Sequence, residues 1–183
     1  MTTDGEKSDR NKPLPGDDGD PRLGQLVRGI RSEFGQMQVL VEELEALDDD
    51  IGEDPATLRE RAAASAFLAS FYMGVENILK RIVRYQNIDL PQGERWHVEL
   101  FKQFCALDSA SSVSNVQNDR LPDLFEGDLI RHMDAYRRFR HVFHHGYERD
   151  LDYDRMRPGI QGARPVLKQF REAVGQYLSS LLN

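Results

Sequence analysis

Arg140, His145 and Tyr147 lie in the run Arg140 to Tyr147, where this chain concentrates the side chains that can do chemistry. A guanidinium stays charged at all working pH values, and its planar set of donors suits a phosphate group. An imidazole titrates near neutral pH and can move a proton. An arginine and a histidine in this pattern can bind and activate a phosphodiester, so RNA is the first substrate class to consider.

The spacing in this run resembles the motif of the HEPN superfamily and, within it, of the HepT-like toxins. That motif is an arginine, four to six residues of which the first is polar, a histidine, and in the HepT branch a tyrosine two positions later. Arg140, the polar His141, His145 and Tyr147 match it position by position. The resemblance extends over roughly residues 22–183.

The resemblance implies a metal-independent endoribonuclease toxin of a type VII-like HEPN/MNT toxin–antitoxin pair. In such an enzyme the 2′-hydroxyl of RNA attacks the adjacent phosphorus, with His145 for the proton transfers and Arg140 for the developing charge. The resemblance also implies a two-fold homodimer whose two motifs face one cleft. Its partner would be an MNT-type nucleotidyltransferase antitoxin, which neutralises the toxin by attaching AMP to Tyr147.

Helical geometry raises a difficulty for this register. At roughly 100° per residue, Arg140 and His144 share one helix face, whereas His145 lies roughly 140° from Arg140. The family register therefore requires the helix to unwind or end before Gly146, or requires a site assembled across two chains. His144 stays a candidate as a substitute or supporting residue, and the polar His141 is a second supporting candidate.

Other interpretations of the same residues remain open. His141 and His145 are four positions apart and could hold a metal ion with Glu148 or Asp150, but the sequence has no cysteine cluster and no third ligand at a recognised spacing. We therefore predict neither a metal nor a cofactor. Glu76, within an apolar segment, is either a surface or salt-bridged carboxylate or a supporting partner of the motif.

Two further hypotheses involve no catalysis. A HEPN module without turnover would bind nucleotide, RNA or the transferase as a scaffold. A structural helical dimer would use its histidines only for packing. Replacing Arg140 or His145 by alanine separates these from an enzyme, because only an enzyme has cleavage to lose.

The pattern of apolar residues predicts an all-α, up-and-down bundle of four to five helices. The first helix is expected to end at Asp48–Asp50 and Gly52, and the second to start with Asp54 as N-cap and Pro55 in its first turn. Residues 109–122 and 150–158 are expected to be irregular. The predicted helices cover roughly residues 23–47, 56–86, 94–107, 123–145 and 164–182.

Composition limits the class of protein. The 183 residues suit one domain, 22–183, preceded by a flexible acidic tail, 1–21. The chain has one cysteine, Cys105, and we find neither a signal-peptide core nor a stretch approaching membrane-span length, so we expect a cytoplasmic protein without a membrane partner.

Charge is unevenly distributed along the chain. Residues 1–60 hold 16 acidic and 7 basic side chains, whereas residues 61–183 hold 15 acidic and 17 basic ones. A local basic cleft is therefore compatible with the net charge of −7. The candidates for such a cleft, which are equally compatible with a solvated helix face, are the arginines near the motif: Arg131, Arg137, Arg138, Arg140 and Arg149.

Overall fold

The structure, a computed structural model, describes residues 20–106, 121–145 and 151–182, with side chains in the second range only as far as Arg140. The all-α prediction is confirmed, since the described residues contain five helices and no strand, only an isolated bridge between Cys105 and Phe125. The helices are α1 (Pro21–Ile51), α2 (Leu58–Tyr85), α3 (Trp96–Lys102), α4 (Gly127–His145) and α5 (Tyr153–Ser180).

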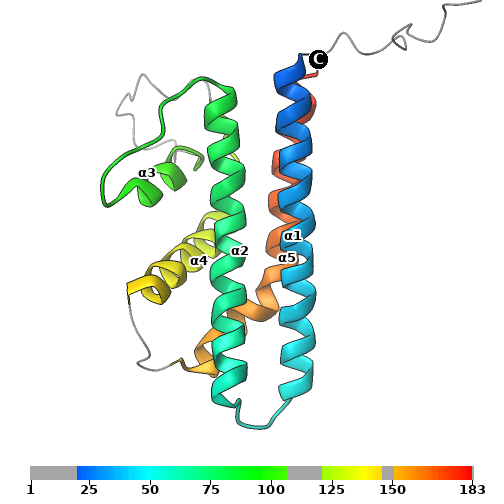
Figure 1. Ribbon diagram of the computed structural model, residues 1–183, viewed down its shortest axis with the longest axis vertical. Coiled ribbons are helices and arrows are strands. Elements are labelled where there is room, and N and C mark those ends of the chain that lie inside the picture. The colour runs from blue at the N-terminus through cyan, green and yellow to red at the C-terminus, as the bar shows by residue number, and fades with distance from the viewer. Residues whose placement is uncertain (1–19, 107–120, 146–150, 183) are drawn as a thin grey trace, which may run out of the picture.

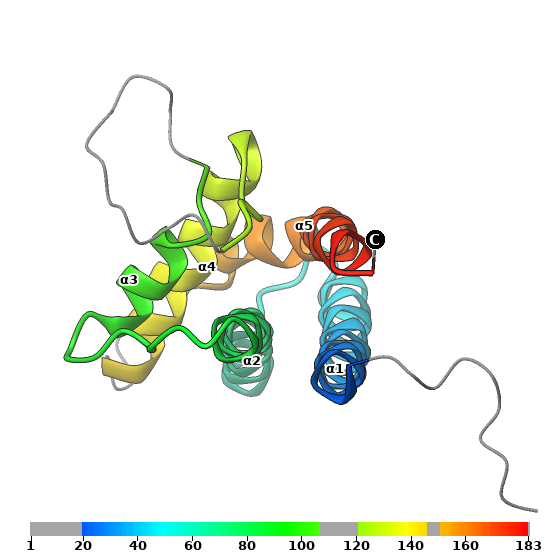
Figure 2. The same ribbon diagram turned by 90° about the horizontal axis from the view of Figure 1, so that it is seen from above.

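Three long helices, α1, α2 and α5, run along the long axis of the molecule, and α4 crosses α2 obliquely (Figure 1). Viewed from above, α2 has α1 and α5 on one side and α3 and α4 on the other (Figure 2). The chain runs down α1, up α2 and finally up α5. This arrangement makes α2 the central helix, as its apolar composition predicts.

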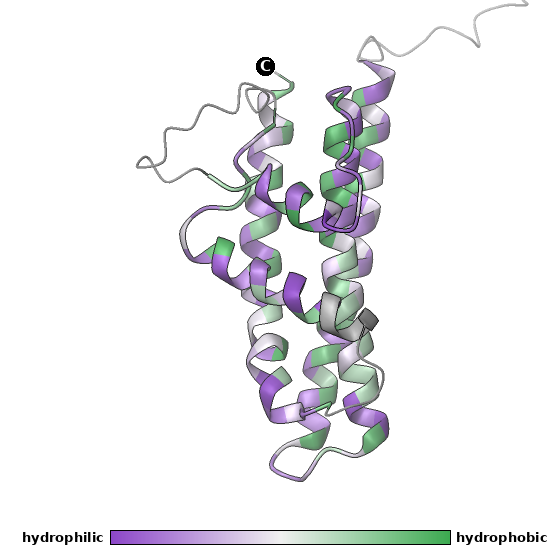
Figure 3. Ribbon diagram, turned by 90° about the vertical axis from the view of Figure 1, so that its left-hand side faces the viewer, coloured by the Kyte–Doolittle hydropathy of each residue, from purple (hydrophilic) through white to green (hydrophobic). Residues whose placement is uncertain are grey.

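The core of the molecule gathers around α2. Its residues Phe71, Tyr72, Val75, Ile78 and Leu79 are completely buried. By length and composition alone α2 could cross a membrane, contrary to our expectation from the sequence, but 61% of its most apolar stretch is buried inside the molecule. Helices apolar on all sides are typical of core positions. Hydrophilic and hydrophobic residues alternate along the helices in Figure 3, as amphipathic packing requires.

The first helix is longer than predicted at both ends. It begins at Pro21 with Asp20 as N-cap, two residues that we assigned to the tail, and residues 1–19 of that tail lie outside the described part. It also continues through Asp48–Asp50, whereas the other part of the predicted stop, Gly52, is its C-cap. The Asp48 carboxylate accepts hydrogen bonds from Tyr153 and Arg157 of α5, both at 3.0 Å, so its charge is partnered inside the fold.

Capping at the start of α2 differs from the prediction. The N-cap is Thr57, not Asp54, and Pro55 precedes the helix. Thr57 and Glu60 form a capping box, in which the Thr57 N–H donates to Glu60 Oε2 at 2.6 Å. A box satisfies two backbone donors at once, which a single N-cap side chain does not.

The third and fourth helices are shorter than predicted because backbone pairing joins residues 104–106, after α3, to residues 124–125, before α4. The Ala106 N–H donates to the Phe125 carbonyl at 2.9 Å, and the Phe125 N–H donates to the Phe104 carbonyl at 3.0 Å. These bonds end α3 at Lys102 and delay α4 to Gly127. The predicted loop at 109–122 lies outside the described residues except for its last two.

The last helix begins eleven residues earlier than predicted, at Tyr153 rather than Arg164. Asp152 caps it by accepting from the Asp154 and Arg155 N–H groups, so residues 153–158 are helical rather than irregular, while 151–152 precede the helix. Pro158 lies inside the helix. A proline within a helix bends it, and the first turns of α5 run at an angle to the rest (Figures 1 and 2).

Candidate functional site

The predicted Arg140 lies on the face of α4 that packs against α2. Its Nη2 is 3.3 Å from Glu76 Oε2, and its side chain is only 19% exposed. One turn earlier, Tyr136 fixes α4 by packing on Phe71 at a ring distance of 5.0 Å and by donating to the Gly159 carbonyl at 2.6 Å. The core contacts of Tyr136 therefore direct the Arg140 guanidinium toward the buried carboxylate.

Glu76 forms a salt bridge, as one interpretation of the sequence expected. It is not a surface residue, since its side chain is 2% exposed. It is also the side chain that contacts the motif arginine. Burial raises the pKa of the Glu76 carboxyl, and the positive charges of Arg140 and Lys80 oppose that rise. Glu76 is therefore a carboxylate whose charge depends on its cationic neighbours.

Hydrogen bonding at this pair is incomplete. Glu76 Oε1, Arg140 Nε and the Tyr72 hydroxyl are buried atoms with no hydrogen-bond partner among the described residues. Tyr72 precedes Glu76 by one helical turn, and burial together with the Glu76 charge raises the pKa of its phenol. Unpartnered buried polar atoms are rare and costly in folded proteins, so three at one place distinguish this site from ordinary core packing.

Two residues that the sequence analysis missed complete the cluster. Lys80 lies one turn after Glu76 on α2, and its Nζ is 4.3 Å from the centre of the Trp96 ring of α3. The Arg140 guanidinium carbon is 5.9 Å from the same ring. Burial lowers the pKa of Lys80, while Glu76 raises it. The i,i+4 spacing of Glu76 and Lys80 is the sequence signal that indicates their proximity.

The arginines of α4 that precede Arg140 do not form the expected basic cleft. Arg131 pairs with Asp128, and both Arg137 and Arg138 pair with Asp134, each at 2.6 Å. Arg131 and Arg138 are exposed, in agreement with the alternative interpretation of a solvated helix face, whereas the Arg137 side chain is only 13% exposed. Arg149 lies outside the described residues.

The described backbone of α4 stays helical through His145. The helix therefore does not unwind between Arg140 and His145, and over this stretch the helical spacing places His144, rather than His145, on the face of Arg140. Residues 146–150 lie outside the described part of the chain. The side chains of His141, His144 and His145 and all of Tyr147 lie outside the described part of the chain. Among the side chains that the structure describes, which do not include those of the motif histidines, no three of His, Cys, Asp or Glu are grouped to hold a metal ion.

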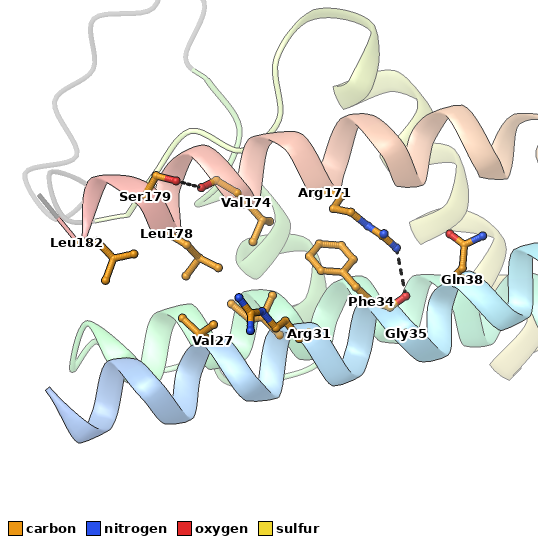
Figure 4. A pocket seen from close by; sticks show the side chains of 12 residues that line it. Val27, Arg31, Phe34, Gly35, Gln38, Arg171, Val174, Leu178, Ser179 and Leu182 are labelled. Carbon is orange, nitrogen blue, oxygen red and sulfur yellow. Dashed lines mark hydrogen bonds between the residues drawn. The ribbon is translucent and has the colours of Figure 1, made fainter. Parts of the chain in front are cut away.

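A cavity of about 560 Å³ lies elsewhere, between α1 and α5. Its lining is largely apolar, and Arg171 closes one side by donating to the Phe34 carbonyl at 3.4 Å (Figure 4). No motif residue lines it. This groove and the Arg140 cluster therefore occupy opposite sides of α2.

Comparisons with known proteins agree with the motif. The family described as HepT-like protein matches residues 63–181, which include most of α2 and all of α3, α4 and α5. No curated protein and no solved structure matches the chain. Since the match covers more than half of the chain and contains the Arg140 cluster, the protein belongs to the HepT-like family of the HEPN superfamily.

Proposed function

We propose that this protein is a metal-independent endoribonuclease toxin of a type VII-like HEPN/MNT toxin–antitoxin pair. The observation that carries the proposal is the position of the Arg140 guanidinium, which lies 3.3 Å from the buried Glu76 of α2. Arg140 precedes His145 on α4 by five residues. Membership of the HepT-like family supports the same conclusion. A partly buried, oriented guanidinium suits the charge that develops on a phosphorane.

The proposed reaction needs only protein side chains and the RNA. The 2′-oxygen forms a bond to phosphorus as its proton passes to an imidazole, and the bond from phosphorus to the 5′-oxygen breaks as that oxygen takes a proton. His145 is the proposed proton carrier, with His144 and His141 as supporting candidates. The products are a 2′,3′-cyclic phosphate and a 5′-hydroxyl.

A two-fold homodimer is part of the proposal. The described part of α4 stays helical from Arg140 through His145, so a cleft shared by two chains offers a way for an arginine and a histidine to meet one phosphate. An MNT-type nucleotidyltransferase is the proposed antitoxin. AMP attached to Tyr147, two residues after His145 in the sequence, would bring phosphate charge and bulk next to the motif and compete with RNA.

The first test is expression of the wild-type chain and of its His145→Ala variant without any partner. Growth arrest by the wild type alone, and cutting of total RNA by the purified protein in EDTA, are the expected results. The cut ends should carry cyclic phosphate, and an RNA with 2′-O-methyl groups throughout should stay intact because it lacks the attacking hydroxyl. Equal cutting of that RNA, or equal activity of the variant, would overturn the proposed mechanism.

A second candidate is a non-catalytic module that binds RNA, nucleotide or the transferase at the same cluster. The ion pair between Arg140 and Glu76 is the observation that favours a binding module, because a guanidinium already paired to a carboxylate can serve as a binding group. A folded, unmodified wild type that binds RNA, leaves it intact in EDTA and does not arrest growth would support this candidate. Both candidates fit our prediction of a cytoplasmic protein.

A further inference from the structure

The balance of charge around Arg140 differs between its two sides. On α4 each of the three preceding arginines has a carboxylate partner, because Asp128 pairs with Arg131 and Asp134 is shared by Arg137 and Arg138, which leaves one net positive charge. On the α2 side, the Glu76 carboxylate has two cations near it, Arg140 of α4 and Lys80 of α2. A third cation, Arg84 of α2, interacts with Lys80.

Arg84 continues the line of charge beyond Lys80. It lies one turn later on α2, so Glu76, Lys80 and Arg84 share one face of the helix at four-residue spacing. Arg84 is exposed, and among the described residues no carboxylate lies within ion-pair distance of it. Its positive charge lowers the pKa of Lys80, so the two cations interact.

Lys80 is held in place by more than charge. Its ammonium lies over the Trp96 ring at 4.3 Å, and the adjacent α3 limits how far its side chain can move. Trp96 is itself half-buried, and its ring packs edge-on against the buried His97 at 5.9 Å. Lys80 is therefore an oriented cation beside Arg140, rather than a freely moving surface lysine.

We propose that Lys80 and Arg84 form the track on which single-stranded RNA lies as it enters the site, so that the strand follows α2 away from Arg140. This inference rests on the proposed action on RNA and adds the path of the strand. The paired arginines of α4 make the opposite path less favourable. Lys80 and Arg84 are binding residues in this proposal, because they hold phosphates beside the one that reacts.

The test is binding of a fluorescent, fully 2′-O-methylated single-stranded RNA, measured by anisotropy over a range of salt concentrations. Each cation that contacts a phosphate contributes roughly 0.7 to the slope of log affinity against log salt for a single strand. Lys80→Gln and Arg84→Gln should each weaken binding and reduce the slope by about that amount. Lys80→Arg should restore the slope, because it keeps the charge.

Matched controls come from α4. Arg131→Gln and Arg138→Gln remove exposed cations that already have carboxylate partners, and neither should change the slope. An unchanged slope in the Arg84→Gln variant, whose exposed position makes misfolding an unsuitable explanation, would overturn the track. A reduced slope only in the α4 variants would place the strand along α4. Failure of the wild type to bind this RNA would contradict the proposed function itself. That result can be distinguished from the two outcomes that concern only the path of the strand.

Discussion

Two carboxylates on opposite sides of the bundle are partnered in very different ways. Asp48, at the end of α1, accepts hydrogen bonds from Tyr153, Arg157 and Gln161 of α5, all at 3.0 Å. Glu76, on the α3–α4 side of α2, has one cation at 3.3 Å and one oxygen without a partner. Asp48 joins two helices, whereas Glu76 holds a functional side chain and leaves part of its hydrogen-bonding capacity unused.

The difference indicates where stability and function lie in the molecule. A fully partnered carboxylate stabilises the folded state, since hydrogen bonds to a charged group contribute more than neutral ones. An incompletely partnered buried carboxylate costs stability, and proteins retain such groups mainly where they serve a site. The α1–α5 side should therefore respond to mutation through stability and the α3–α4 side through activity.

The largest expected effect tests the functional side. Arg140→Ala should lower RNA cleavage by roughly 10²–10³-fold, the size typical of losing one group that stabilises developing charge. Arg138→Ala is the matched control, because Arg138 is 73% exposed and paired with Asp134. Initial rates on a defined RNA, with melting temperatures for both variants, provide the comparison. Equal losses in the two variants would contradict a special role for Arg140.

The next effect tests the structural side. Asp48→Ala removes the acceptor of three hydrogen bonds and should lower the free energy of unfolding by about 2–4 kcal/mol. Asp49→Ala, at an exposed neighbouring position, should change it by less than about 0.5 kcal/mol. Urea denaturation measures both. RNA cleavage per folded molecule should stay unchanged, and a selective loss of cleavage in Asp48→Ala would remove the distinction between the two sides.

A smaller effect is expected where α1 meets α2. A Cβ at Gly74 would lie 2.6 Å from Cγ of the buried Met37, so Gly74→Ala should destabilise the fold by about 1–2 kcal/mol. Gly35→Ala in α1 meets nothing within 4 Å and should stabilise by about 0.5–1 kcal/mol. The denaturation midpoints of the two variants test this prediction. A shift of both midpoints in the same direction would contradict the close approach of α1 and α2 at Gly74.

The smallest change concerns pH. The folded chain binds a proton on Glu76 more tightly than the unfolded chain, because burial raises the pKa of its carboxyl above the ordinary value of 4.5. The stability that this contributes is complete below about pH 4.5 and is lost as the pH rises through the folded-state pKa. The glutamine of the Glu76→Gln variant cannot ionise. The free energy of unfolding of this variant, relative to that of the wild type, should therefore increase as the pH rises over this range.

Chemical denaturation at pH 4.0 to 7.5 tests this prediction, because all other titrating groups cancel in the difference between the two proteins. Parallel curves for the wild type and Glu76→Gln would show that Glu76 keeps an ordinary pKa in the fold. Glu76→Gln should also lower RNA cleavage, since it removes the charge that holds Arg140. This readout separates a positioning role from a purely structural one.

Local signals in the sequence determined the class of fold and the central helix. The apolar face of residues 21–51 and the all-round apolar character of α2 follow from residue type and helical period alone. The boundaries were less predictable, because the stop at Asp48 is overridden by donors from α5 and the start of α4 by pairing of 104–106 with 124–125. These partners lie far along the chain, where periodicity carries no information.

For the site, the sequence by itself determined the motif, because Arg140, His145 and Tyr147 lie within eight residues and their chemistry depends on residue type and spacing. Only the tertiary structure decided the partners of Arg140. Glu76 is 64 positions away, and it contacts Arg140 because α4 packs across α2. The structure also decided which cations stay unbalanced, because burial and distance, rather than composition, determine whether a charge is neutralised in the fold.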